Sequence, residues 1–122
     1  MAAFALPKGS DEEKAARAAA IEAATLNAAS VPLRTMEASL KALPLALEVA
    51  QKGLSASASD AGVAALAALA GIRGAALNVR INAASLKDRA SAEPLLARAA
   101  AIESEALALQ DAVLAEVNSH IG

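Results

Sequence analysis

The side chains that could carry out chemistry lie in one stretch, residues 55–82. Three of them are close together near the start of this stretch: Ser57, Ser59 and Asp60. A carboxylate at Asp60 could work as a general acid or base, or could face a cationic group of a substrate. Ser59 and Asp60 could equally cap the N-terminus of a helix, where their oxygens would meet free backbone N–H groups and the positive end of the helix dipole. The sequence by itself leaves both interpretations open.

Two asparagines, Asn78 and Asn82, stand near the end of the same stretch. They are four residues apart, so they share one face of a helix. Their amides could bond to a neighbouring helix or to a polar heterocycle in a ligand, and both alternatives remain. Arg80 lies roughly 160° around the helix from each of them, so we expect it to form an ion pair on another surface. On an unbroken helix Asp60 and Asn78 would be about 27 Å apart, too far to contact one reacting atom.

These side chains must be positioned by helices, because the composition favours almost nothing else. The sequence has 122 residues, enough for one domain over residues 1–122, and 57% of them are hydrophobic although Phe4 is the only aromatic residue. Alanine accounts for 38 residues, and alanine has the highest helix propensity because it loses no side-chain entropy. We therefore predict an all-α antiparallel bundle of about four helices, one of them buried and rich in alanine.

The helix boundaries follow from capping residues and prolines. Ser10 and Glu13 fit a capping box, which predicts a helix from residue 11 to about residue 29. The Ser-Val-Pro sequence at residues 30–32 predicts a break and a second helix over residues 32–52, which Pro44 should kink or split before a C-cap at Gly53.

The remaining sequence predicts two more helices. The third runs from Asp60 to about residue 83 and carries little charge, so we expect it to be buried on most sides, with Gly71 and Gly74 allowing close helix packing. The fourth should be capped by Ser91, with Pro94 in its first turn, and it carries an apolar stripe: Leu95, Leu96, Ala99, Ile102, Ala106, Leu109, Val113 and Val117.

Charge and residue usage exclude several functional classes. The net charge is −2 and no basic block or set of aromatic residues is present, which argues against nucleic-acid binding. Cysteine is absent, and His120 has no second metal-ligand type beside it at helical spacing, so we expect no metal site. Arg73 and Arg80 interrupt the apolar third segment, and the N-terminus lacks the features of a signal peptide. We therefore predict a cytoplasmic protein without membrane contact.

Two segments together resemble the cyclodeaminase/cyclohydrolase family, which includes the C-terminal domain of formiminotransferase-cyclodeaminase and free-standing bacterial relatives. They are Ser-Ala-Ser-Asp-Ala-Gly-Val-Ala-Ala-Leu at residues 57–66 and Arg-Gly-Ala-Ala-Leu-Asn-Val-Arg-Ile-Asn at residues 73–82. Met-Ala-Ala-Phe at residues 1–4, Leu-Pro-Lys at residues 6–8 and Ala-Ala-Ser-Val-Pro-Leu at residues 28–33 follow the order and spacing of that family's middle helices. The resemblance covers nearly the whole chain.

The resemblance implies packed antiparallel helices, a homodimer or higher homo-oligomer, and a tetrahydrofolate derivative as substrate. The expected reaction is either cyclisation of 5-formiminotetrahydrofolate with loss of ammonia or hydrolysis of 5,10-methenyltetrahydrofolate to the 10-formyl compound. Asp60 would be the catalytic residue, because a carboxylate can balance an amidinium-like cation and move a proton. Ser57, Ser59, Asn78 and Asn82 would bind substrate, and the chemistry requires no metal or redox cofactor.

The sequence also departs from the family pattern in two places. Family members generally carry an N-terminal portion with a glycine-rich segment, and this sequence begins where their middle helices do, so we expect a chain that lacks the N-terminal third. The loop before Ser57 usually holds asparagines, whereas residues 53–56 here are Gly-Leu-Ser-Ala. The alternative to an enzyme is therefore a catalytically inactive helical module, derived from the family, that serves self-association through exposed apolar faces.

Overall fold

A computed structural model describes all 122 residues, and it confirms the all-α antiparallel bundle. Four α-helices make up most of the chain, and two short 3₁₀ helices precede α1 and α3. In chain order the elements are η1 (Ala2–Ala5), α1 (Asp11–Leu40), α2 (Ala42–Lys52), η2 (Ser55–Ser57), α3 (Ala58–Ser85) and α4 (Arg89–Ile121).

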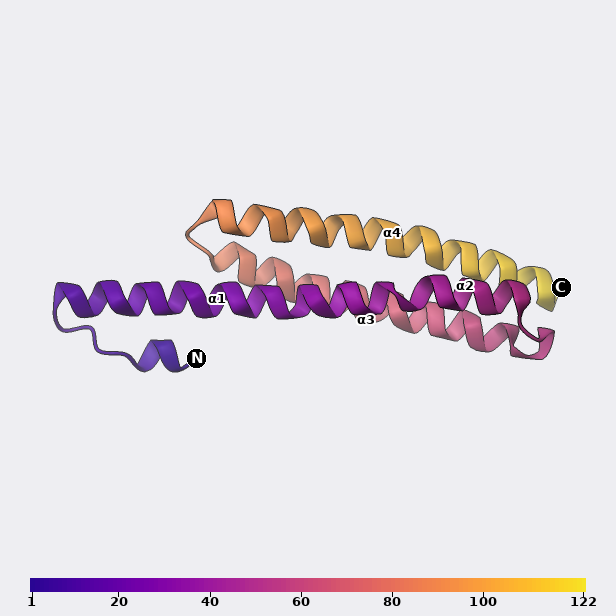
Figure 1. The fold of residues 1–122 in the computed structure, drawn as a ribbon, viewed down its shortest axis with the longest axis horizontal. Helices are drawn as coiled ribbons and strands as arrows, with labels where there is room; N and C mark the ends of the chain where they lie inside the picture. The colour runs from indigo at the N-terminus through magenta and orange to yellow at the C-terminus, as the bar shows by residue number, and fades with distance from the viewer.

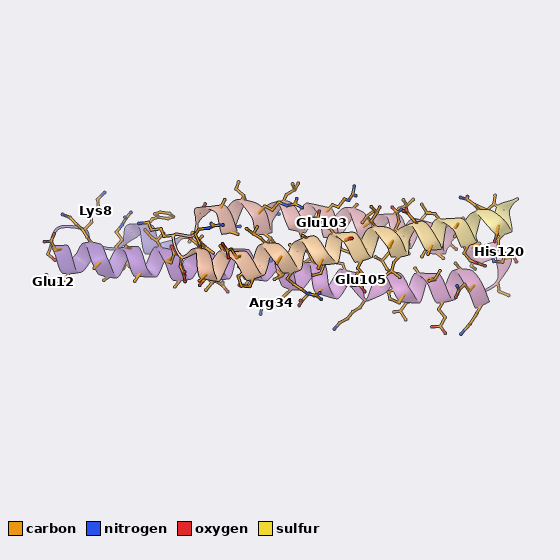
Figure 2. The ribbon with its side chains drawn as sticks, turned by 90° about the horizontal axis from the view of Figure 1, so that it is seen from above. Lys8, Glu12, Arg34, Glu103, Glu105 and His120 are labelled. Atoms are coloured by element: carbon orange, nitrogen blue, oxygen red, sulfur yellow. The ribbon has the colours of Figure 1, made fainter.

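The helices form an elongated bundle that is three rods wide. Helices α1 and α2 lie end to end as one long rod, α3 runs back beside it, and α4 returns in the direction of α1 (Figure 1). The start of α1 extends past the turn between α3 and α4, and the N-terminal segment folds back along it (Figure 1). The view from above places Lys8 and Glu12 at one end of the molecule and His120 at the other (Figure 2).

The core buries little apolar area per residue, because most of its side chains are the methyl groups of alanine. Of the 20 buried hydrophobic residues, 11 are alanines. The largest fully buried side chains, which run along the middle of the bundle, are Met36, Leu43, Ile72, Val79, Ile102 and Val113. The apolar stripe predicted for the fourth helix is confirmed: five of its eight residues are buried and the other three are half-buried. Small side chains let the three rods pack closely, but each one removes little apolar area from water.

The predicted break at residues 30–32 is wrong, because α1 continues through Pro32 to Leu40. Proline removes one backbone donor and crowds the carbonyl four residues earlier, but packing of α1 along α3 outweighs this local penalty. The rod is interrupted instead at Lys41, three residues before Pro44, as expected from the effect of that proline. Gly53 ends α2 as predicted, and a Cβ there would lie 2.5 Å from the Val49 carbonyl oxygen.

The start of α4 also differs from the prediction. Its N-cap is Asp88, whose carboxylate accepts a hydrogen bond from the Ala90 N–H at 3.1 Å. Ser91 lies within the first turn and donates its hydroxyl to Asp88 at 2.6 Å, which lowers the pKa of the Asp88 carboxyl. Pro94 lies in the second turn of the helix rather than the first. Asp88 rather than Ser91 caps the helix, because an ionised carboxylate is a stronger hydrogen-bond acceptor than a hydroxyl at the positive end of the helix.

Helix α3 is the central helix, but it is buried on one side only. Its inner side packs against both α1 and α4 and supplies nine buried residues, whereas its outer side is exposed. With η2 it is long and apolar enough to cross a membrane by length and composition, with a mean hydropathy of 1.5 over an 18-residue window. Core helices of soluble proteins meet the same criterion, so this single segment is weak evidence for a membrane span.

Candidate functional site

The residues at the start of α3 do not cap the helix as one of the two interpretations predicted. The helix begins at Ala58, so Ser59 and Asp60 are its second and third residues. Ser57 occupies the N-cap position, but its side chain makes no capping hydrogen bond. The 3₁₀ turn of η2 leads directly into α3 and leaves Ser57 at φ −99° and ψ 6°, outside the extended region in which a capping hydroxyl reaches the backbone.

Asp60 lies in a groove of about 330 Å³ between α2 and the start of α3. It is the only polar residue of the groove; the other six are Ala42, Leu45, Ala46, Val49, Ala61 and Ala64. Asp60 is exposed and has no hydrogen-bond or ion-pair partner among the side chains of the protein. It lies in the first turn of α3, near the positive end of the helix dipole. The groove therefore offers one free carboxylate beside an apolar wall.

The two serines near Asp60 do not line this groove. Ser59 is exposed and points roughly 100° around the helix from Asp60, and Ser57 is half-buried just before the helix. The structure thus keeps the three residues adjacent in sequence but brings only Asp60 into the groove. Neighbouring residues on a helix diverge in direction, and residues three or four apart are the ones that share a face.

Asn78 and Asn82 line a second groove, of about 680 Å³, between α1 and α3. The residues from α1 are Ala28, Val31, Pro32 and Thr35, and those from α3 are Gly71, Gly74, Ala75, Asn78 and Asn82. Because α3 is unbroken from Ala58 to Ser85, Asp60 and Asn78 are separated along it by about 27 Å. The structure therefore places Asp60 in one groove and the two asparagines in another, which agrees with the separation expected from the sequence.

Asn82 supports the fold of α1, which bears out the helix-to-helix bonding that was one alternative for it. Its side-chain amide donates to the Ala28 carbonyl oxygen of α1 at 3.2 Å. In a regular helix this oxygen would accept the N–H of residue 32, but residue 32 is proline and has none. Asn82 thus supplies the donor that Pro32 lacks, and this is why α1 can pass through Pro32 with its carbonyl satisfied.

Asn78 and Arg80 of α3 also have identified partners. The Asn78 amide donates within its own helix to the Gly74 carbonyl oxygen at 3.3 Å, and the rest of this side chain is exposed. Arg80 forms the predicted ion pair, with Glu103 of α4. Asn78 is therefore the asparagine of this pair that remains available to a ligand in the second groove.

A third pocket, of about 360 Å³, lies where the turn between α3 and α4 meets α1, and sequence reasoning missed it. Four of its eight residues are basic: Lys8, Lys14, Arg17 and Lys87. Its one acid, Glu22, accepts hydrogen bonds from the backbone N–H groups of Lys87 and Asp88, both at 2.9 Å. The spacing of Lys14 and Arg17 on one helical turn was the only local signal, because the fold alone brings Lys87 to them.

Comparison with known proteins agrees with the resemblance. The family model described as formiminotransferase-cyclodeaminase matches residues 1–101. A curated protein named methenyltetrahydrofolate cyclohydrolase, from Methylorubrum extorquens, is 49% identical over 53 residues, which are 43% of this chain. The matched segment spans 26% of the length of that relative.

Proposed function

This chain belongs to the formiminotransferase-cyclodeaminase family, and on that premise we propose that it acts in folate one-carbon metabolism as a 5,10-methenyltetrahydrofolate cyclohydrolase in the cytoplasm. The observation that carries the proposal is the carboxylate of Asp60, which has no partner in the protein and is the only polar group of an apolar groove. The apolar wall of α2 suits a flat ring system, and the carboxylate suits the positive charge of the methenyl bridge.

The hydrolysis needs one proton acceptor and one proton donor, and Asp60 can be both. As water adds to the bridging carbon between the two nitrogens, the Asp60 carboxylate takes a proton from it and a neutral tetrahedral adduct forms. The bond from this carbon to N5 then breaks, N5 receives the proton held by the Asp60 carboxyl, and the hydroxyl proton of the adduct passes to solvent as the formyl carbonyl forms on N10. The overall change is addition of one water and release of one proton, which requires no metal or redox cofactor.

The other predicted residues have supporting roles in this proposal. Ser57 and Ser59 lie next to Asp60 in sequence and would bind the substrate from the edge of the groove. Asn78 would contact a more distant part of an extended folate in the second groove, since its side chain is exposed there. Asn82 would contribute mainly by holding α1 and α3 together, because its amide already donates to Ala28.

Cyclisation of 5-formiminotetrahydrofolate is the second candidate, because the matching family model carries the name of the cyclodeaminase. In that reaction N10 attacks the formimino carbon and its proton passes to the imine nitrogen. The bond to this nitrogen then breaks, and the Asp60 carboxyl would give it the last proton it needs to leave as ammonia. The same groove would serve both reactions. Ammonia release from the formimino compound separates this candidate from the hydrolysis.

Replacement of Asp60 tests the proposal. With 5,10-methenyltetrahydrofolate as substrate, we expect Asp60→Asn to lower kcat by about 10²- to 10⁴-fold, the usual contribution of a positioned acid or base. The loss of the near-ultraviolet absorbance of the substrate reports the rate, corrected for the spontaneous reaction. Glu105→Gln on α4 is the matched control, since Glu105 is also exposed and also lacks a partner.

Two outcomes would contradict the proposal in different ways. Unchanged activity in Asp60→Asn would remove Asp60 from the mechanism but leave the reaction assigned. A parent protein that neither turns over the two substrates nor gains thermal stability from a saturating reduced folate would overturn the enzymatic assignment. The inactive helical module that serves self-association would then be the better description.

A further inference from the structure

The pocket where the turn between α3 and α4 meets α1 carries an excess of positive charge. We call it the basic pocket, and its charged lining residues are Lys8, Lys14, Arg17, Glu22 and Lys87. Four basic side chains and one acid give it a net charge of +3, whereas the whole chain has a net charge of −2. Positive charge is therefore concentrated at this place in a protein that is otherwise acidic.

Three segments that are distant in the sequence contribute the basic side chains. Lys8 precedes α1, and Lys87 lies in the turn between α3 and α4. Lys14 and Arg17 are three residues apart on one face of α1. Bringing like charges together costs free energy. An opposite charge, either from the protein or from a bound anion, offsets that cost.

The carboxylates near the basic pocket are mostly occupied by backbone donors. Glu22 accepts hydrogen bonds at 2.9 Å from two backbone N–H groups of the turn, and Glu13 accepts from two backbone N–H groups just before α1. Asp88 caps α4. Of the four basic side chains only Lys14 has an ion pair, with Asp11 at 3.8 Å, and an exposed pair of this kind contributes little. The protein itself therefore leaves most of the positive charge without a counter-charge.

The remaining basic side chains are available to a ligand. The ammonium groups of Lys8 and Lys87 have no ion-pair partner in the chain. The Arg17 guanidinium donates to the Phe4 carbonyl oxygen at 3.2 and 3.4 Å and lies 5.7 Å from the centre of the Phe4 ring. A carbonyl group and a ring hold the guanidinium in place without cancelling its charge. The basic pocket thus offers two free ammonium groups and one fixed guanidinium.

We propose that the basic pocket is a binding site for a small phosphorylated compound that carries at least two negative charges. Ammonium groups bind phosphate as point charges, and a guanidinium can bind two of its oxygens at once. The volume of about 360 Å³ is at the lower end of the range for small-ligand pockets, so the ligand is compact. Ala18 and Ile21 form a short apolar wall for its organic part.

This site is separate from the groove of the proposed reaction. Asp60 in that groove and Ser85 in the lining of the basic pocket are 25 residues apart on the unbroken α3, which is about 37 Å. An anionic tail on a molecule bound at Asp60 would have to cover this distance, the length of about ten fully extended residues. A second, independent ligand is the simpler occupant of the basic pocket.

Binding would tie the N-terminal segment and the first turns of α1 to the rest of the bundle. No residue between 11 and 20 is buried, so this part of α1 has no core to hold it. An anion that contacts Lys8, Arg17 and Lys87 would connect the N-terminal segment, α1 and the α3–α4 turn. Ligand binding to the folded form alone also raises stability in proportion to the logarithm of its concentration.

Titration calorimetry with inorganic pyrophosphate, at an ionic strength held constant with sodium chloride, tests the site. We expect saturable binding of one pyrophosphate per chain, and Lys87→Gln should weaken it about tenfold or more, the usual effect of losing one charge-assisted contact. The backbone N–H of residue 87 still donates to Glu22 in this variant, so the fold is kept. Lys41→Gln is the matched control, because Lys41 is exposed, has no ion pair and lies outside the basic pocket.

Hydrogen exchange locates the effect. With pyrophosphate at ten times its dissociation constant, we expect the amides of residues 15–20 to exchange about tenfold more slowly, because opening of this helix end would release the anion. The amides of residues 118–121, at the far end of α4, should not change. Unchanged exchange of residues 15–20 at saturation would overturn the proposal.

Three further outcomes would also overturn it. Sodium chloride alone could stabilise the protein as much as pyrophosphate at equal ionic strength, or Lys41→Gln could weaken binding as much as Lys87→Gln; both would indicate general screening of charge. Binding of a triglutamate peptide without binding of pyrophosphate would indicate a polycarboxylate ligand instead. Asp60→Asn should bind pyrophosphate as the parent does, so this site and the proposed reaction can fail independently of each other.

Discussion

At the scale of single residues, two polar side chains of α3, Asn82 and Asp60, differ in whether they have hydrogen-bond partners within the chain. The amide nitrogen of Asn82 is occupied within the chain, because it donates to the Ala28 carbonyl oxygen and to the Asn78 carbonyl oxygen at 2.9 Å. Asp60 has no partner in the chain and sits at the edge of an apolar groove. An occupied polar group supports structure, whereas an unpartnered one beside a groove is available for a ligand. This difference directs mutagenesis of Asn82 to stability and of Asp60 to activity.

The link between Asn82 and Pro32 can be measured with a double-mutant cycle. We expect Asn82→Ala to lower the free energy of unfolding by about 1 kcal/mol, because the Ala28 carbonyl oxygen loses the side-chain donor that replaces the missing N–H of Pro32. In a Pro32→Ala background the backbone N–H of residue 32 takes over this acceptor, so the same substitution should cost clearly less. Urea unfolding of the four proteins gives the coupling energy, and a cost of Asn82→Ala that is equal in both backgrounds would refute the link.

At the scale of the helix, local signals and packing compete for the boundaries. At the start of α4 a local interaction sets the boundary. Asp88 caps this helix, and its pKa is lowered by the Ser91 hydroxyl and by backbone N–H groups at the helix N-terminus. At Pro32 the local signal does not set a boundary. Helix α1 continues through it, because packing of this long helix contributes more stability than the proline costs. A proline therefore sets a helix boundary only where a new helix can begin at once in line with the first. This is the case before Pro44, where α2 follows directly after Lys41.

Because Asp88 caps α4, the stability of the protein should depend on pH. Because the pKa of Asp88 is lower in the folded protein than in the unfolded chain, its ionised form stabilises the fold above the unfolded pKa, and this contribution is lost as pH falls through the folded pKa. We expect Asp88→Ala to lower the melting temperature at neutral pH, and the difference from the parent to shrink below roughly pH 4. Thermal unfolding followed by circular dichroism between pH 2 and 7 measures this, and a constant difference would contradict the role of the carboxylate.

At the scale of the whole molecule, the bundle is long and unevenly supported. Most buried residues lie where all three rods are side by side, whereas α1 begins beyond the turn between α3 and α4 (Figure 1). None of the residues from 11 to 20 is buried, and the Glu22 contacts with that turn mark where the bundle begins. The first turns of α1 therefore depend on their capping box and on alanine's helix propensity rather than on a core.

Hydrogen exchange should follow this division. We expect the amides of residues 15–20 to exchange at least tenfold faster than those of α3 between residues 69 and 79, because fraying opens an unsupported helix end without unfolding the core. Mass spectrometry of peptides from the exchanged protein resolves the two segments. Equal protection of both would show that something covers the start of α1 in solution.

Alanine content, capping residues and helical periodicity determined the helical class, the buried stripe of α4 and the family, because these depend on residues close together in the chain. The separation of Asp60 from Asn78 also followed from helix geometry alone. Only the tertiary structure decided that α1 passes through Pro32, that Asn82 completes it, and that one side of α3 stays exposed. Those features depend on contacts between residues as far apart as Ala28 and Asn82, whose pairing no local pattern encodes.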